Sequence, residues 1–233
     1  MKEEYWMSEY KFPIVTVDLW GDIASFTQSE SKVERRTYPV ITPSAARGAL
    51  CAIYMKPLEF YYQIRKIQVI QEGSRFMIRR NEVTRKADMK HHPIKVEENH
   101  TQRGTEYLRN VYYRITAEMI PVNGTDPRKI RHEFEQRLKA GKCFYQPFLG
   151  TKECLAFFSP ANEEKKPVDK SEDLGVMLYD IFDIRENRPL DTSDKANAGV
   201  CVSYYHPYLI NGIINVPPYE SFEIFKPGGA THV

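Results

Sequence analysis

Apolar positions alternate with polar ones, or run together with β-branched and aromatic residues, in several short segments of the chain. Such patterns are typical of β-strands, because successive side chains point to opposite faces and branched side chains pack well on a pleated surface. The clearest of these segments precede the last third of the chain. We expect strands over Pro13–Trp20, Phe60–Ile70, Arg75–Val83, Asn110–Ile120 and Cys143–Phe158.

A first helix is predicted after the first strand. Thr42 is placed as an N-cap, and Pro43 suits the first helical position because its missing N–H would have no partner there. Pro57 disfavours helical backbone in the residue before it. We therefore expect this helix to span Pro43–Met55.

A second helix is predicted in the middle of the chain. Asp126 and Pro127 give it the same kind of start, and Gly141 ends it in the position that favours left-handed backbone. Apolar residues spaced by four form one stripe, which we expect to be buried. The stripe consists of Ile130, Phe134 and Leu138.

The order of these elements is strand, helix, strand, strand, helix, strand. This order predicts an α+β fold class with a ferredoxin-like, split βαβ unit. We place that N-terminal domain at residues 1–158 and a smaller β-rich C-terminal domain at residues 159–233. The second domain begins with a charged loop at Asn162–Asp173 and continues with the strand-like pieces Leu174–Ile184, Gly199–Tyr205 and Leu209–Val216.

Local charge is more informative than total charge. The net charge of this 233-residue chain is only +2, but residues 75–95 contain seven Lys or Arg against two acids. The segment is either a solvated loop or a nucleic-acid contact surface. The signature with which RRM domains stack bases on a sheet is absent, so RNA binding would use other surfaces.

Cysteine spacing and hydropathy limit the setting in which the protein works. The four cysteines are far apart and form no CxxC pair, so we expect no zinc site and reduced thiols. The N-terminus lacks the apolar core of a signal peptide, and no run has the length of a membrane span. These features predict a cytoplasmic protein with no membrane contact.

Four motifs occur in a fixed order along the chain. TPSAARGAL at Thr42–Leu50 is followed by AIYMKP at Ala52–Pro57, IRRNEV at Ile78–Val83 and LGTKE at Leu149–Glu153. Together they resemble the CRISPR-associated protein family five of subtype I-C, also called Dvulg, a family of the RAMP superfamily. The resemblance runs from Val17 to about Tyr179. The LGTKE motif is not a Walker motif, so nucleotide hydrolysis is not indicated.

The resemblance implies a CRISPR repeat-specific endoribonuclease. Such a protein cleaves precursor CRISPR RNA at the repeat hairpin without a metal or another cofactor, through attack by the ribose 2′-OH. It then stays on the five-prime handle within the type I-C surveillance complex. The implied partners are the repeat RNA hairpin, the mature CRISPR RNA, the family-seven backbone subunit and the family-eight large subunit.

The resemblance also implies three catalytic side chains: a Tyr, a Lys and a His. The first two match Tyr54 and Lys129, although Tyr54 could instead pack below Leu50 and Lys129 could be an ordinary solvated lysine. The expected histidine position is Ile130, which cannot move a proton. His132, three residues after Lys129 and adjacent to it on the helix surface, is the candidate replacement. The alternative is a slower reaction that uses Tyr54 and Lys129 alone.

Basic side chains in and around the motifs are candidates for phosphate contacts. Arg47 and Tyr54, seven residues apart, would share one stripe of the first helix, although Arg47 could instead pair with a local acid. His91, His92 and His100 could suggest a metal, but no well-placed carboxylate or thiol accompanies them. Their place in the basic stretch favours an RNA contact over a metal, and a solvated loop is the simplest alternative. The candidate RNA-binding residues are Arg35, Arg36, Arg47, Arg79, Arg80, Arg85, Lys86, His91, His92 and Arg103.

Two other functions remain open from the sequence. The Ile130 departure is compatible with a non-catalytic subunit that only holds the five-prime handle of the RNA. A basic RNA-binding protein unrelated to CRISPR would bind without preference for a repeat hairpin. Nonspecific DNA binding is also open, since phosphate contacts do not separate RNA from DNA.

Overall fold

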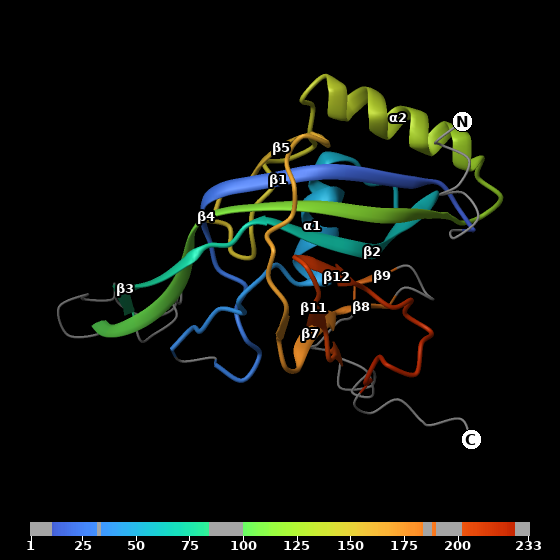
Figure 1. The fold of residues 1–233 in the computed structure, drawn as a ribbon. Helices are drawn as coiled ribbons and strands as arrows, with labels where there is room; N and C mark the ends of the chain where they lie inside the picture. The colour runs from blue at the N-terminus through green and yellow to red at the C-terminus, as the bar shows by residue number, and fades with distance from the viewer. Residues whose placement is uncertain (1–10, 32–33, 84–99, 184–187, 190–201, 227–233) are drawn as a thin grey trace, which may run out of the picture.

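The structure is a computed structural model that describes residues 11–31, 34–83, 100–183, 188–189 and 202–226. An antiparallel sheet runs through the centre of the molecule (Figure 1). It has six strands in the order β12-β2-β4-β1-β5, and β3 pairs with β4 beside this row. The fold is therefore mixed α and β and dominated by antiparallel strands, in agreement with the α+β prediction. The strands are β1 (Ile14–Ala24), β2 (Phe60–Gln71), β3 (Ser74–Val83), β4 (His100–Pro121), β5 (Phe157–Pro160) and β12 (Ile213–Asn215).

The first helix, α1 (Pro43–Ile53), begins where the sequence predicts but ends earlier. The Thr42 hydroxyl accepts the Ala45 N–H at 3.2 Å, as expected for an N-cap. Tyr54 is the C-cap, and its backbone is extended at φ −152° and ψ 123°. The prediction that Tyr54 shares a helical stripe with Arg47 is therefore wrong. The Tyr54 ring instead packs beside Phe60 of β2, at a centroid distance of 5.3 Å.

The second helix, α2 (Pro127–Lys139), confirms the sequence prediction closely. The Asp126 carboxylate caps it by accepting the Arg128 N–H at 2.9 Å. Gly141 follows the helix with a φ of +63°, in the left-handed region that glycine reaches without strain. The predicted stripe of Ile130, Phe134 and Leu138 is buried, which fixes the face that α2 turns toward the sheet.

The prediction of a strand over Cys143–Phe158 is wrong. Turns and bends occupy half of this segment, and β5 covers only its end and the two residues beyond it. Gly150 explains part of the difference: its φ is +90°, and a Cβ there would lie 1.9 Å from the Ser25 carbonyl oxygen. The apolar side chains of this segment therefore fill the core from a turn rather than from a strand.

β4 is about twice as long as the predicted segment Asn110–Ile120. Its second half lies in the main sheet, between β1 and β2. Its first half forms a hairpin with β3 that extends away from the rest of the sheet (Figure 1). Asn110 marks the change between the halves, with a φ of +58° that Asn tolerates better than most residues.

Short strand pairs make up the C-terminal part of the chain. β6 (Glu172–Asp173) pairs with β11 (Tyr208–Leu209), β7 (Met177–Asp180) pairs with β10 (Ser203–Tyr205), and β8 (Phe182–Asp183) pairs with β9 (Arg188–Pro189). β12 returns to the main sheet and pairs with β2. The division at residue 158 stays a prediction.

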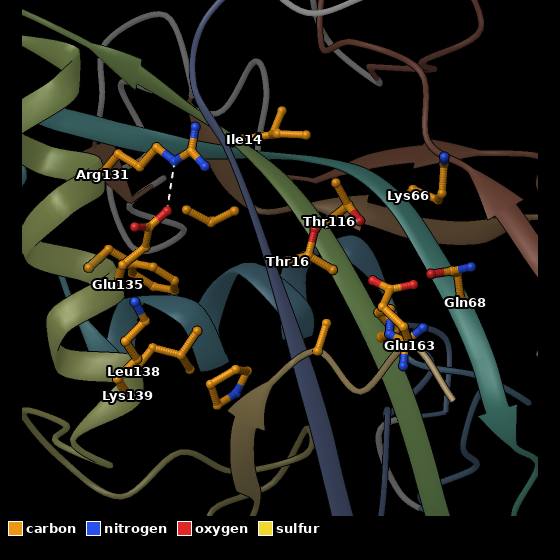
Figure 2. A pocket seen from close by; sticks show the side chains of 15 residues that line it. Ile14, Thr16, Lys66, Gln68, Thr116, Arg131, Glu135, Leu138, Lys139 and Glu163 are labelled. Carbon is orange, nitrogen blue, oxygen red and sulfur yellow. Dashed lines mark hydrogen bonds and ion pairs between the residues drawn. The ribbon is translucent and has the colours of Figure 1, made fainter. Parts of the chain in front are cut away.

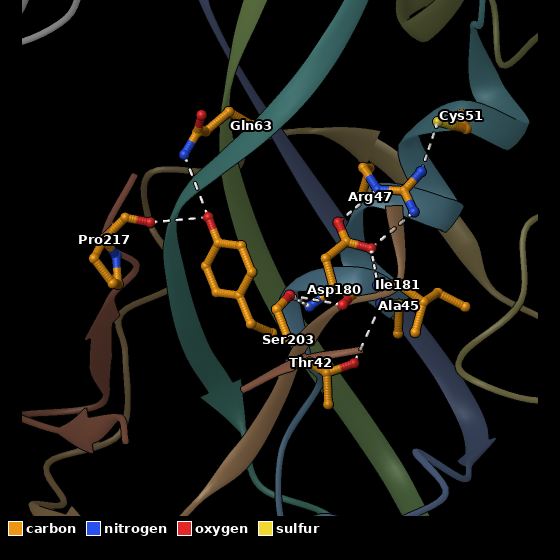
Figure 3. Close-up of polar contacts among 10 residues, drawn as sticks. Thr42, Ala45, Arg47, Cys51, Gln63, Asp180, Ile181, Ser203 and Pro217 are labelled. Carbon is orange, nitrogen blue, oxygen red and sulfur yellow. Dashed lines mark hydrogen bonds and ion pairs between the residues drawn. The ribbon is translucent and has the colours of Figure 1, made fainter. Parts of the chain in front are cut away.

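A buried ion pair joins the C-terminal part to α1 (Figure 3). Arg47 donates from Nε and Nη2 to the two carboxylate oxygens of Asp180, at 2.7 and 2.9 Å. Both side chains are largely buried, at 13 and 4 % exposure. Nearby, the Tyr179 hydroxyl donates to the Pro217 carbonyl and accepts from Gln63 of β2. β7 is thus attached to both α1 and the main sheet.

Neither helix of the described residues has the length and apolar character needed to cross a membrane.

Candidate functional site

The Tyr54 side chain lies between the end of α1, the start of β2 and the turn after α2. Its ring stacks on Phe60 and on Phe144, with centroid distances of 5.3 and 6.2 Å. The guanidinium of Arg137 lies 4.1 Å from the Phe144 ring centre and 5.7 Å from that of Tyr54. Tyr54 is only 1 % exposed. The predicted catalytic tyrosine is therefore a packed residue whose hydroxyl alone has a polar role.

That hydroxyl donates a hydrogen bond to Glu133 Oε2 on α2. Lys56 Nζ lies 3.1 Å from the same oxygen and 3.2 Å from Glu59 Oε1. Burial and the hydrogen bond to Glu133 raise the pKa of Tyr54 to about 12. The same hydrogen bond, with the charges of Lys56 and Lys129, holds the pKa of Glu133 below its ordinary value. Near neutral pH the phenol is therefore protonated and the carboxylate is ionised.

Lys129 and His132 both lie exposed on α2, but only one of them belongs to this cluster. Lys129 precedes Glu133 by one turn, and its positive charge acts on the Glu133 carboxylate. His132 lies two residues after the buried Ile130, on the side of the helix away from the core and about 100° around the helix from Glu133. Its catalytic role stays a prediction that this arrangement does not support.

Sequence reasoning missed several members of this cluster, which are Lys56, Glu133, Arg137 and Phe144. One signal was available for two of them: Glu133 and Arg137 follow Lys129 at intervals of four and so share its side of the predicted helix. The sequence did not indicate that Tyr54 contacts this side of α2. It predicted Tyr54 on a stripe of the first helix, and that prediction was wrong.

A second group of charged side chains lies on the β3–β4 hairpin. Arg80 and Arg103 are directly opposite each other in the antiparallel register, so both point to the same face. Glu82 lies between them and Arg35, with nitrogen–oxygen distances of 3.8 Å to Arg80, 3.3 Å to Arg103 and 3.9 Å to Arg35. We call Arg35, Arg80, Arg103 and Glu82 the hairpin cluster.

Arg80 has further contacts beyond the hairpin. Its Nη1 lies 2.9 Å from Glu153 Oε1, in the LGTKE motif, and its Nη2 donates to Thr105 at 3.2 Å. Two of the sequence motifs, IRRNEV and LGTKE, thus meet at one ion pair. The side chains of Arg35, Arg103 and Glu153 are more than one third exposed. Those of Arg80 and Glu82 are slightly less exposed, at 32 and 29 %. They can therefore exchange their acidic partners for another anion without unfolding.

The remaining predicted RNA contacts fall into three groups. Arg36 and Arg79 are exposed, and Arg79 lies opposite Gly104, on the other face of the hairpin from Arg80. Arg47 is buried against Asp180, so a phosphate contact would require breaking that pair. Arg85, Lys86, His91 and His92 lie outside the described residues.

A groove of about 730 Å³ lies on the other side of α2 (Figure 2). On α2 it is lined by Arg131, Glu135 and Lys139, and Arg131 Nε donates to Glu135 Oε1 at 2.7 Å. The sheet contributes Thr16 and Thr116, which face the groove from β1 and β4. None of the predicted catalytic residues lines it, and its mixed charges favour no single class of ligand.

Solved structures share this arrangement of elements. A structure described as a CRISPR-associated protein superposes with a TM-score of 0.64 and 21 % identity, and it covers 93 % of this chain and 98 % of its own. A functionally uncharacterised protein from Streptococcus mutans superposes at 0.61 with 20 % identity, covering 93 and 99 %. The chain thus has a fold found among CRISPR-associated proteins.

Sequence relatives identify the family. The chain belongs to the Cas5d family of CRISPR-associated proteins, whose model matches residues 14–217. A protein of Thermus thermophilus named CRISPR pre-crRNA endoribonuclease Cas5d is 38 % identical over 90 % of this chain and 94 % of its own length. A protein of Mannheimia succiniciproducens with the same name is 34 % identical, over 90 and 97 %. The resemblance in the four motifs is therefore confirmed along nearly the whole chain.

Proposed function

We propose that this chain is an endoribonuclease that cleaves the repeat hairpin of precursor CRISPR RNA. The observation that carries the proposal is its identity of 38 and 34 %, over 90 % of the chain, to two proteins named as pre-crRNA endoribonucleases. After cleavage the chain stays on the five-prime handle in the type I-C surveillance complex. Its partners there are the family-seven backbone subunit and the family-eight large subunit.

The proposed chemistry uses the RNA itself as the nucleophile and needs no metal. The 2′-OH beside the scissile phosphate attacks phosphorus, which gives a cyclic phosphate and a five-prime hydroxyl. Negative charge then grows on the phosphorane oxygens, and fixed cations are the groups that stabilise it. The cluster around Glu133 supplies Lys56 and Lys129 for this purpose.

The proposed RNA surface is centred on the β3–β4 hairpin. The arginines of the hairpin cluster are partly exposed and only partly neutralised by Glu82 and Glu153. Arginine can bind a phosphate through two nitrogens or stack on a base. We assign the RNA contacts of the described residues to Arg35, Arg36, Arg79, Arg80 and Arg103. Nonspecific binding of DNA through the same phosphate contacts is part of this proposal.

A second candidate function is a handle-binding subunit that does not cleave. The observation that favours it is Ile130, which lies fully buried where the resemblance implies a histidine. His132 does not take the position of Ile130, because it is exposed on the side of α2 that faces away from the core. A protein of this kind would keep the hairpin surface and lack the reaction.

We also propose the ferredoxin-like, RAMP-type description of the sheet. The support is the strand order β2-β4-β1-β5, with α1 between β1 and β2 in the chain and α2 between β4 and β5. The division into residues 1–158 and 159–233 accompanies this proposal. Limited proteolysis that released either part as a folded unit would support the division.

The deciding experiment incubates the purified protein with its own repeat RNA in excess EDTA. A matched RNA carries one 2′-deoxy substitution at the cleaved position. We expect one discrete cut that disappears with the deoxy RNA, because the 2′-OH is the nucleophile. Tight, salt-sensitive binding without a cut would contradict the nuclease proposal and support the handle-binding subunit. A cut that requires a divalent metal would contradict the proposed chemistry.

A further inference from the structure

Glu133 is the point where the polar contacts of the Tyr54 site converge. Its Oε2 accepts the hydrogen bond of the Tyr54 hydroxyl and lies 3.1 Å from Lys56 Nζ. Lys129 lies one turn earlier on the same side of α2. A hydroxyl and two ammonium groups are therefore placed around one carboxylate, an arrangement that exceeds what a surface glutamate needs for solvation.

The accessible part of this site is the carboxylate and not the phenol. The side chains of Glu133 and Lys56 are 36 and 34 % exposed. Tyr54, in contrast, is 1 % exposed and is sandwiched between Phe60 and Phe144. An RNA strand docked at this site would thus meet Glu133 and Lys56 first, with the tyrosine below them.

The protonation states of the Tyr54 phenol and the Glu133 carboxylate also distinguish the two groups. The Tyr54 hydroxyl is occupied as a donor, and its raised pKa keeps the phenol protonated near neutral pH. Glu59 Oε1 also pairs with Lys56 Nζ, at 3.2 Å. Glu133 is the carboxylate that contacts both Lys56 and the Tyr54 hydroxyl. It is thus the group placed to accept a proton.

We propose that Glu133 is the catalytic proton acceptor of the RNA-cleavage reaction and that Tyr54 is a positioning residue that holds its carboxylate. This inference rests on the proposed function. Glu133 takes the proton of the 2′-OH while the 2′ oxygen bonds to phosphorus and the bond from phosphorus to the five-prime oxygen breaks. The leaving oxygen takes a proton from water, and Glu133 afterwards returns its proton to the solvent. Lys56 and Lys129 face the charge that forms on the phosphorane.

The pH dependence of the rate separates this role from a structural one. The groups facing Glu133 are Tyr54 and Lys56 from the end of α1 and the following loop, and Lys129 from α2, with Arg137 over the Tyr54 ring. Because the pKa of Glu133 is lowered, its carboxylate is ionised throughout about pH 6 to 8. The wild-type cleavage rate should therefore be flat over this range. Without the carboxylate, hydroxide is the remaining base, and the rate should rise about tenfold per pH unit.

The test measures single-turnover cleavage of repeat RNA in EDTA at several pH values, with RNA affinity and thermal unfolding measured in parallel. We expect Glu133→Gln to bind RNA normally, to lose about 10²- to 10⁴-fold in rate at pH 7, and to show the tenfold rise per pH unit. Glu133→Asp should recover part of the rate and the flat profile. Glu135→Gln is the matched control, because Glu135 is an exposed carboxylate on α2 that pairs with Arg131 instead.

Several outcomes would overturn the inference. A wild-type rate in Glu133→Gln would do so, and so would a slowed rate with a profile that stays flat. If Glu133→Gln does not fold, Tyr54→Phe decides the question: a positioning role requires a slower rate with a flat profile, and a rate that rises tenfold per pH unit would make Tyr54 the acceptor. Absence of cleavage by the wild-type protein would overturn both this inference and the nuclease proposal, whereas the variants test the inference alone.

Discussion

Two places in this molecule bring arginines and acids together, and they differ in their exposure to water. Arg47 and Asp180 form a bidentate pair that is nearly out of contact with solvent. The hairpin cluster instead holds three arginines around Glu82 at 3.3 to 3.9 Å, and each side chain is 29 % exposed or more. From the sequence, Arg47 and Arg80 were equal candidates for RNA contact. Burial assigns the first to the fold and leaves the second available to a ligand.

The energetics of the two regions follow from this difference. Removing one partner of a buried pair leaves a charge without solvent or counter-ion, which costs about 3 to 5 kcal/mol. An exposed pair contributes about 0 to 1 kcal/mol, since water and salt replace the missing partner. A charged side chain should therefore affect either stability or RNA binding strongly, depending on the region in which it lies.

The largest effect is expected from Arg47→Met, which keeps the apolar stem and removes the charge. Asp180 would then be buried without its partner, so we expect the free energy of unfolding to fall by about 3 to 5 kcal/mol in urea denaturation. Arg131→Met, which breaks an exposed pair with Glu135 on α2, is the control and should cost less than about 1 kcal/mol. A decrease of less than about 1 kcal/mol for Arg47→Met would contradict the comparison.

The double variant Arg47→Met with Asp180→Leu sharpens that result. It removes both charges, so no unpaired ion is left inside the protein. We expect it to be more stable than Arg47→Met alone, which a thermodynamic cycle of the four proteins would show as a coupling energy. Additive effects of the two substitutions would mean that the side chains act independently.

The next effect concerns RNA and not stability. Arg80→Gln combined with Arg103→Gln should change the free energy of unfolding by less than about 1 kcal/mol. The slope of log affinity against log salt should fall by about 0.7 to 0.9 for each phosphate that the protein no longer neutralises. Filter binding of repeat RNA between about 50 and 200 mM KCl would measure this slope. Lys170→Gln, which removes an exposed cation paired with Glu72 and Glu172, should leave the slope unchanged.

The smallest effect is expected from Glu82→Gln. This substitution should strengthen RNA binding, whereas the arginine substitutions should weaken it. Glu82 competes with RNA phosphates for three arginines, so its removal should tighten RNA binding by up to about fivefold, equivalent to about 1 kcal/mol. The salt slope should become steeper in the same titration. Unchanged or weaker binding would show that Glu82 orders the arginines more than it occupies them.

The parts of the fold that the sequence predicts well depend on local contacts. Thr42 with Pro43, and Asp126 with Pro127, start the two helices because a cap and a fixed φ act within a few residues. The segment Cys143–Phe158 was mispredicted because its apolar residues resemble a strand, whereas Gly150 has a positive φ and lies directly against the backbone of the distant Ser25. Contacts between residues far apart in the chain thus overrode the local pattern.

The same limit applies to the site. The motif resemblance pointed to Tyr54 and Lys129, and the structure brings both to Glu133. Glu133 itself could not be predicted as their meeting point, because its hydrogen bond to Tyr54 spans 79 positions in the chain. Arg47 shows the converse: the sequence left open a phosphate contact or an ion pair with a nearby acid, whereas its counter-ion Asp180 is 133 positions away in the chain.

The pairing of β12 with β2 has a consequence for how the protein is made. β2 leaves the ribosome early, but the edge that β12 covers stays without this partner until residues 213–215 have been synthesised. An open strand edge is a template for pairing with other chains, and long-range pairing of this kind forms slowly. The nascent sheet is therefore vulnerable to aggregation for most of its synthesis. The last described strand, only three residues long, then covers the middle of β2 at Lys66–Gln68.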